Sequence, residues 1–307
     1  MSAPSLAQQT GRLEPVAEGL HAWVQPDGGW CLSNAGVITG GGSAILVDTA
    51  ATRARAIALR DAVRSVAQAG PRLVVNTHHH GDHVFGNGVF AGQATIVAHE
   101  QCRAEMAAAG LGLQKLWPGV DWGVDELTLP AVTFTGRLTL HAGDLTTELL
   151  HAGPAHTTND VVAWVPEHRV LFAGDVAMSG ATPFCLMGSV RGSVEALGRL
   201  RGLNPRVVVP GHGPVAGPEV LDECEAYLRW VQRTAERGRR AGQPPLAAAR
   251  DADLAGFGRL LDPERLVGNL HRAYAELDGA PPGAPIDIMA GFGEMIEYHG
   301  GPLPCSA

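Results

Sequence analysis

A dense group of imidazole and carboxylate side chains stands out in the segment VVNTHHHGDHVFGNGVF, residues 74–90. Four histidines and one aspartate occupy six consecutive positions there, directly after an apolar run. Such groups are costly to bury unless they are paired or bind a metal ion. His78 and His80 are one residue apart, and Asp82 and His83 follow at once. On a turn leaving a strand, this spacing can direct two pairs of side chains to neighbouring points, and Zn²⁺ accepts such nitrogen and oxygen ligands readily.

The alternative for this segment is a solvated polar loop or a histidine tract of the kind used for purification. A tract of that kind would not follow LVVNT in mid-chain, and it would not include Asp82. Further candidates lie downstream, where His156, Asp175 and His212 occur near short apolar strands and beside Gly or Pro. Taken singly, each is more typical of a turn. Together with the first segment they predict one metal site built on strand ends.

The surrounding pattern is that of an α/β protein in which strands and helices alternate. Apolar runs bounded by Gly and Pro predict strands, and helical spacing of Ala, Leu and Val predicts helices. We predict strands at 19–25, 31–50, 72–77, 94–100 and 206–213, antiparallel strands over 127–153 and a hairpin at 160–175. We predict helices at 52–70, 101–111, 193–203, 219–242, 246–261 and 263–279, with a last short helix after the Pro-rich stretch 280–287. A catalytic domain would span 1–215, and a helical C-terminal segment, 216–307, would pack on it.

The composition limits which binding partners and which cellular compartment we expect. A net charge of −8 over 307 residues gives no electrostatic reason to expect nucleic acid or an anionic membrane as a partner. Residues 1–16 have neither the basic nor the apolar region of a secretory signal. The five cysteines are scattered and form no CxxC pair, which favours reduced thiols and a cytoplasmic location.

Four motifs together resemble the metallo-β-lactamase superfamily: THHHGDH (77–83), GPAHTTND (153–160), FAGD (172–175) and VPGHG (209–213). The resemblance runs from about residue 15 to 215 and implies a four-layer αββα sandwich with a helical C-terminal extension and two zinc ions, with iron or manganese as alternatives. It implies that His78, His80 and His156 hold the first ion, that Asp82, His83 and His212 hold the second, and that Asp175 bridges them. Asp82 and Asp175 would be the catalytic carboxylates, Asp48 would support the site, and His79 would point away. Asn159, Met178, Phe184 and Met187 would surround it as supporting or pocket residues.

Departures from the family patterns narrow the expected activity. Asp175 stands where the best-known β-lactamases carry cysteine, which is more similar to glyoxalase II and to thioester, lactone and ester hydrolases. The stretches 24–36, 76–90 and 175–190 also resemble the second-ring cyclases of aromatic polyketide pathways in actinomycetes. That similarity implies a cyclase–thioesterase acting on a poly-β-ketone tethered to an acyl carrier protein, by attack of a metal-bound hydroxide on the thioester or by ring closure through a metal-stabilised enolate. A general small-molecule thioester or lactone hydrolase remains the alternative. A β-lactamase is less favoured, as is a non-catalytic binding protein, since all seven ligand positions are filled.

A row of cations in the C-terminal segment has two interpretations. Arg229, Arg233 and Arg237 recur every four residues and share one face of the predicted helix, and Glu225 precedes Arg229 at the same spacing. The row is either a solvated charged face or a docking patch for an acidic carrier protein.

Overall fold

The computed structural model describes residues 11–307, which form two mixed β-sheets and flanking helices. The expectation of no secretory signal in residues 1–16 therefore falls mainly outside the described residues. The first sheet has seven strands in sequential order, antiparallel from β1 to β4 and parallel from β4 to β7. Its strands are β1 (Arg12–Ala17), β2 (Leu20–Val24), β3 (Ala35–Gly40), β4 (Ser43–Val47), β5 (Leu73–Asn76), β6 (Thr95–His99) and β7 (Val132–Phe134).

The second sheet has five strands in the order β12-β11-β10-β9-β8. Only the β11–β12 pair in it is parallel. Its strands are β8 (Arg137–Ala142), β9 (Leu145–His151), β10 (Val161–Val165), β11 (Val170–Met178) and β12 (Val207–His212).

Alternating apolar side chains join the two sheets face to face. In β4, Ile45 and Val47 point into a core shared with Leu149, Val161 and other residues of the second sheet. Between them, Leu46 points to the opposite face, where it packs with residues of the helix α2 (Arg53–Val66). This alternation follows from the two-residue period of a strand, and it leaves both faces of the sheet apolar.

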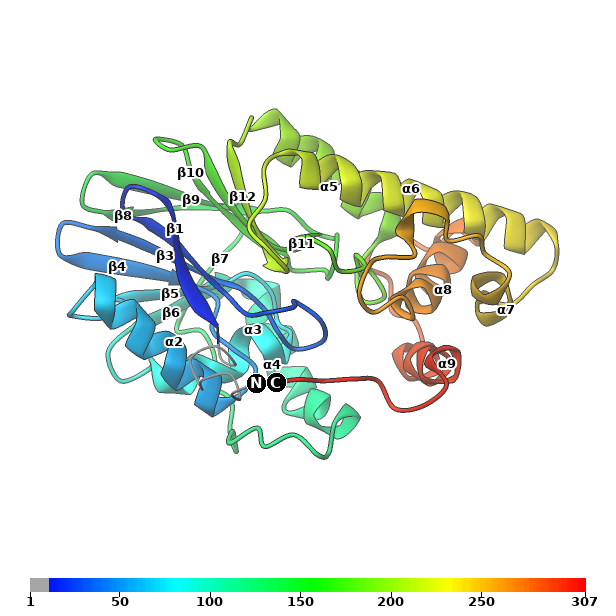
Figure 1. The fold of residues 1–307 in the computed structure, drawn as a ribbon, viewed down its shortest axis with the longest axis horizontal. Coiled ribbons are helices and arrows are strands. Elements are labelled where there is room, and N and C mark those ends of the chain that lie inside the picture. The colour runs from blue at the N-terminus through cyan, green and yellow to red at the C-terminus, as the bar shows by residue number, and fades with distance from the viewer. Residues whose placement is uncertain (1–10) are drawn as a thin grey trace, which may run out of the picture.

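Helices cover the two outer faces. Figure 1 shows α2 against the first sheet and α5 (Val190–Gly202) with α6 (Glu219–Arg240) over the second. The result confirms the four-layer αββα sandwich. Short helices complete the first half: α3 (Gly81–Val84), η1 (Phe85–Val89), α4 (Glu100–Ala109) and η2 (Gly112–Leu116). Among residues 11–307, no helix is long and apolar enough to cross a bilayer.

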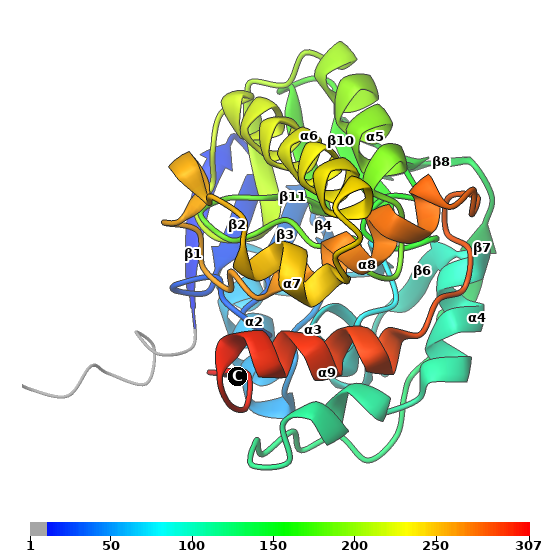
Figure 2. The same cartoon turned by 90° about the vertical axis from the view of Figure 1, so that its right-hand side faces the viewer.

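The C-terminal region consists of α6, α7 (Pro245–Arg250), η3 (Ala255–Phe257), α8 (Arg265–Leu277) and α9 (Ile288–His299). In Figure 2, α9 runs across the molecule below α7 and α8. After α9 the chain returns to the first half, where the Leu303 carbonyl accepts a hydrogen bond from Trp117 Nε1 at 2.9 Å. The boundary at residue 215 between two segments stays a prediction.

Two predicted elements were wrong. The single helix at 246–261 is interrupted, since Asp251 ends α7 and Asp253 and Gly256 favour turns over helix. The strands at 127–153 are not all antiparallel. β7 follows β6 through α4, and a connection containing a helix places β7 parallel to β6 in the first sheet.

Candidate metal centre

The seven predicted ligands converge at one edge of the sandwich. Six of them sit at or beyond strand ends, but Asp175, which we expected at the exit of its strand, lies inside it, because β11 continues to Met178. His78 and His80 follow β5, and Asp82 and His83 lie in the short helix α3. His156 lies in the loop between β9 and β10, Asp175 lies within β11, and His212 ends β12. Their ligand atoms form two clusters, each with all atoms within 4.8 Å of one another.

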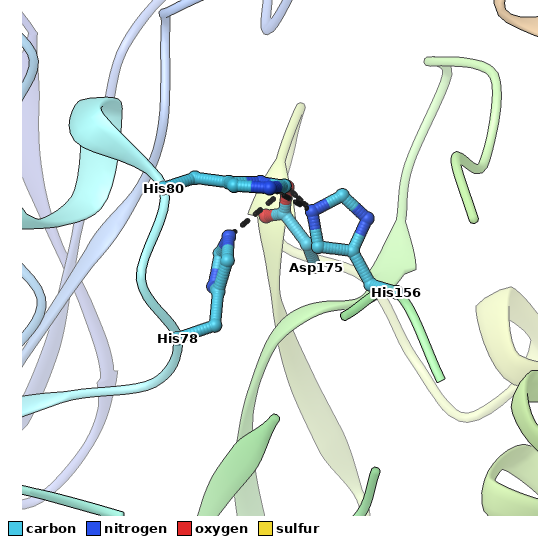
Figure 3. Close-up of side chains that lie close together, drawn as sticks. All are labelled: His78, His80, His156 and Asp175. Atoms are coloured by element: carbon cyan, nitrogen blue, oxygen red, sulfur yellow. Dashed lines mark hydrogen bonds and ion pairs between the residues drawn. The ribbon is translucent and has the colours of Figure 1, made fainter. Parts of the chain in front are cut away.

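The first cluster consists of His78, His80, His156 and Asp175. In Figure 3 the three rings and the carboxylate turn toward a common point. His156 Nε2 lies 2.8 Å from His80 Nδ1 and 3.3 Å from Asp175 Oδ2, and His78 Nε2 lies 3.9 Å from the same Oδ2. Two ligand atoms on a tetrahedral zinc ion lie about 3.3 Å apart, given Zn–N bonds of about 2.0–2.1 Å. The spacing in the cluster is therefore close to that of a metal site.

The second cluster consists of Asp82, His83 and His212. His212 Nε2 lies 3.3 Å from Asp82 Oδ2, and His83 Nε2 lies 3.7 Å from it. Asp175 joins this cluster to the first, since its Oδ1 is 3.1 Å from His83 Nε2 and its Oδ2 is 3.5 Å from His212 Nε2. One carboxylate thus faces both clusters, as a bridging ligand must.

Two glycines allow the backbone to place Asp175. Gly174 has a φ of 50°, and a Cβ there would lie 2.8 Å from Thr77 Oγ1. Gly211 in the neighbouring strand passes so close that its Cβ would lie 1.9 Å from Asp175 Oδ1. The β11–β12 register also shifts on both sides of Gly174, an irregularity of the kind that re-aims side chains near functional sites.

Four of the histidines are fixed by partners on the far side of the ring. Nδ1 of His83 lies 2.9 Å from Asp48 Oδ2, and Nδ1 of His156 lies 2.5 Å from the Phe184 carbonyl. These acceptors require that Nδ1 carry the proton, so the Nε2 lone pair faces the cluster. His212 Nδ1 makes the same contact with the Gly28 carbonyl at 3.1 Å.

His78 is held in the same tautomer by a relay. Thr77 Oγ1 donates to Asp48 Oδ2 at 2.7 Å and so accepts from His78 Nδ1 at 3.0 Å. Asp48 also accepts from the Thr77 N–H at 2.7 Å, so its carboxylate orients one histidine of each cluster. It does so from a left-handed backbone conformation, with φ at 62°, a strain typical of functional sites.

The electrostatics of the clusters favour a bound cation. Burial lowers the pKa of His78 and His80 well below the ordinary value, and it lowers the pKa of His156 to about 4. These rings are therefore neutral, as metal ligands must be. Burial also opposes charge on His212, but the carboxylates of Asp175 and Asp82 raise its pKa to about 9. The second cluster thus attracts positive charge, which a metal ion would supply.

The donor set fits two metal ions. Nε2 of His78, Nε2 of His83 and Oδ1 of Asp175 are buried without a hydrogen-bond partner among residues 11–307. Buried polar atoms are rarely left unpaired, and a site for a bound ion is a standard reason. His/Asp donors suit Zn²⁺ and also Fe and Mn. The chain therefore holds two clusters consistent with a dinuclear metal site.

The remaining predicted residues either line a cavity or lie outside it and contact neighbouring side chains. Met178, Phe184 and Met187 line a cavity beside the clusters, and their role as a substrate pocket stays a prediction. Asn159 does not line it. Its Nδ2 lies 3.0 Å from His79 Nδ1, and the ring of His79 is outside both clusters.

Several residues of the cavity wall were not anticipated. Three of them are aromatic, and they come from distant segments: Trp30, Cys31, Leu113, Trp117, Arg265 and Phe292. Arg265 belongs to α8 and Phe292 to α9, so the C-terminal helices supply part of the wall. The sequence spacing of these two residues does not indicate their place in the wall, because that place depends on how the helices pack. The cavity measures about 40 Å³, room for on the order of three waters.

The arginine row of α6 contributes no residue to the clusters or to the cavity wall. Arg229, Arg233 and Arg237 are all exposed. Arg229 Nε lies 2.6 Å from Glu225 Oε1, the pair expected from the spacing.

Comparisons with known proteins agree with this geometry. Residues 28–212 match the family model described as the metallo-beta-lactamase superfamily, and this span holds all seven cluster residues. A metallo-beta-lactamase type 2 from Bacteroides fragilis is 23% identical over 218 residues, which are 68% of this chain and 81% of that protein. A hydroxyacylglutathione hydrolase from Methylococcus capsulatus is 30% identical over 130 residues, 42% of this chain and 43% of that protein. The match thus spans less than half of the second relative.

A solved structure shows the same fold. The metallo-beta-lactamase from Pontibacter korlensis aligns with a TM-score of 0.61 at 20% identity, covering 71% of this chain and 99% of that chain.

Proposed function

The chain belongs to the metallo-β-lactamase superfamily and is a metal-dependent hydrolase with a dinuclear His/Asp site, and we propose that its substrates are acyl thioesters. The observation that carries the proposal is the position of Asp175, an oxygen ligand that faces both clusters where the best-known β-lactamases carry cysteine. The relative from Methylococcus capsulatus supports it, because its name describes hydrolysis of an acylated glutathione.

Two metal ions, when bound, would supply a water nucleophile at neutral pH and polarise the acyl carbonyl. His78, His80 and His156 would hold one, Asp82, His83 and His212 the other, and Asp175 would contact both. Each role follows from a donor atom that faces the clusters.

The protein's own groups would move the proton and hold the acyl group. Asp82 lines the cavity, so its carboxylate faces the space that the reacting carbonyl must occupy. It can accept a proton from the attacking water and return it to the departing thiolate, which is general acid–base catalysis by one carboxylate. Met178, Phe184 and Met187 line the same cavity, where an apolar wall excludes water and packs against an acyl chain.

A second candidate is a cyclase–thioesterase acting on a poly-β-ketone carried by an acyl carrier protein. Trp30, Phe184 and Phe292 favour it, since their rings lie together at centroid distances of 5.6–6.3 Å in the cavity wall. Aromatic walls suit flat, conjugated substrates, and they could hold a folded chain so that its enolate carbon lies against an internal carbonyl, with bound metal ions supplying the stabilisation that the enolate needs.

Turnover of two substrate classes tests the proposal. The zinc-loaded protein is assayed at one concentration against nitrocefin and against a panel of acyl thioesters, including thioesters of a carrier protein. We expect thioester hydrolysis to exceed lactam hydrolysis clearly. Efficient lactam turnover without thioester turnover would reverse this assignment.

A further inference from the structure

Arg265 opens α8 and lines the cavity beside the metal clusters, although it is only 1% exposed. A buried guanidinium is costly unless its charge and its five N–H groups find partners. Nη2 lies 2.9 Å from Asp262 Oδ2, and Nη1 donates to the Thr182 carbonyl at 3.2 Å. Nη1 also approaches Met178 Sδ at 3.2 Å, a weak acceptor. Within residues 11–307, Nε has no partner.

An aromatic ring holds this cation in place at the cavity. The Arg265 guanidinium lies 4.1 Å from the centroid of the Trp30 ring, within the range of a cation–π interaction. Trp30 is fixed in turn, since its Nε1 donates to Glu264 Oε1 at 2.6 Å. Its ring also packs against Phe184 and Phe292. The cavity wall therefore contains an aromatic ring on which the Arg265 guanidinium, itself paired with Asp262, is stacked.

A second arginine of the same helix shows what a purely structural role looks like. Arg272 is also 1% exposed. Its Nε and Nη2 donate to the Leu186 carbonyl at 3.1 and 2.8 Å, and its Nη1 donates to the Ala284 carbonyl at 2.7 Å. All three of its nitrogens are thus used on the backbone, whereas Arg265 keeps an unused donor and lines the cavity.

We propose that Arg265 and Trp30 form a subsite for an anionic oxygen on a flat acyl group, which the metal centre holds for hydrolysis. The ligand chemistry is a carboxylate or an enolate attached to an aromatic or conjugated system. The guanidinium pairs with the oxygen, and the ring of Trp30 stacks on the planar part. The subsite adds a substrate class to the proposed thioesterase function. Hydrolysis of the bound ligand rests on that proposed function, whereas binding of the ligand does not. Because the cavity is small, the aromatic side chains must move apart as the ligand enters.

The test measures binding, so it does not depend on turnover. Calorimetry of the zinc-loaded protein compares 4-carbamoylbenzoate with neutral terephthalamide, two flat ligands that differ in one charged group. We expect the anion to bind the unaltered protein at least about tenfold more tightly, the factor expected of one hydrogen bond to a charged group. Arg265→Gln should reduce this preference to within about twofold.

Matched variants separate the subsite from folding and from the metals. Arg272→Gln removes a buried arginine of the same helix and should lower stability while the preference for the anion remains. Should Arg265→Gln not fold, Arg265→Lys keeps the charge but loses the planar fork, and a smaller preference is expected.

Two results would overturn the subsite. One is equal affinity of the unaltered protein for both ligands. The other is an unchanged preference in the folded Arg265 variant, which would mean that the metals alone bind the carboxylate. Absence of thioester turnover would contradict the proposed function and leave this binding result standing.

Discussion

Replacing Asp48 by Asn should weaken metal binding more than any comparable change outside the ligands, because one carboxylate orients two histidines. Asn tolerates the left-handed φ of 62° at this position, so the backbone should be preserved. Its amide oxygen can still accept from the Thr77 N–H, which lies 2.7 Å from Oδ1. The new amide nitrogen would then face His83 Nδ1, 2.9 Å from the present Oδ2.

Two donors cannot share that contact, so His83 must change its tautomer or rotate. With the proton moved to Nε2, the ring offers no lone pair to the second cluster. Side chains that orient metal ligands are typically worth 10–100-fold in metal affinity. The expected loss is therefore about 1.4–2.7 kcal/mol in binding free energy for the second ion. The first cluster should lose less, since Asp48 reaches His78 only through the Thr77 hydroxyl.

The assay is a zinc titration against a competing chelator, combined with metal analysis of the dialysed protein. Thr147→Val is a suitable control, because Thr147 is fully buried and its hydroxyl has no partner among residues 11–307. This variant should bind both ions like the unaltered protein. Wild-type affinity for both ions in a folded Asp48→Asn protein would refute the reasoning.

Three further outcomes follow from the geometry. Metal analysis of the unaltered protein should find two ions per chain. Asp175→Ala should lower that content and reduce turnover by more than about a hundredfold, while the circular dichroism spectrum stays unchanged. One ion or none in fully active protein would contradict the dinuclear site. Gly211→Ala should lower the free energy of unfolding in a denaturant titration by at least about 1–3 kcal/mol and should also lower the metal content, because its Cβ would lie 1.9 Å from a carboxylate oxygen. Gly92→Ala is the control: nothing lies within 4 Å of its new Cβ, so this variant should bind metal normally. Replacing the three exposed arginines of the α6 row by Glu should slow turnover of carrier-bound thioesters at low salt but not turnover of a small free thioester; these are Arg229, Arg233 and Arg237. An equal effect on both substrates would rule out a docking patch.

The sequence was most informative where side-chain chemistry and strand position coincide. His78 and His212 sit at or just beyond the ends of short apolar strands, and strands of this kind end at one edge of a sheet, so their convergence could be predicted from the sequence. The left-handed conformation of Asp48 could not, because a strand-end aspartate adopts it only when the surrounding contacts impose it.

The packing of the C-terminal helices could not be predicted from the sequence. The pattern over 246–261 suggested one helix, since Ala and Leu recur at helical spacing, but the intervening aspartates and glycines favour turns. Nothing in the sequence around Arg265 or Phe292 indicates that these side chains line the cavity beside the metal clusters. Their place in the wall depends on the angle at which α8 and α9 dock, and that angle depends on contacts between residues far apart in the chain.

All seven cluster residues lie within the span that matches the family, 28–212, whereas Arg265 and Phe292 lie outside it. The metal centre and part of the cavity wall thus belong to different stretches of the chain. Substitutions in α8 and α9 can therefore change the cavity wall without replacing a ligand, and a relative with the same metal motifs need not share the substrate.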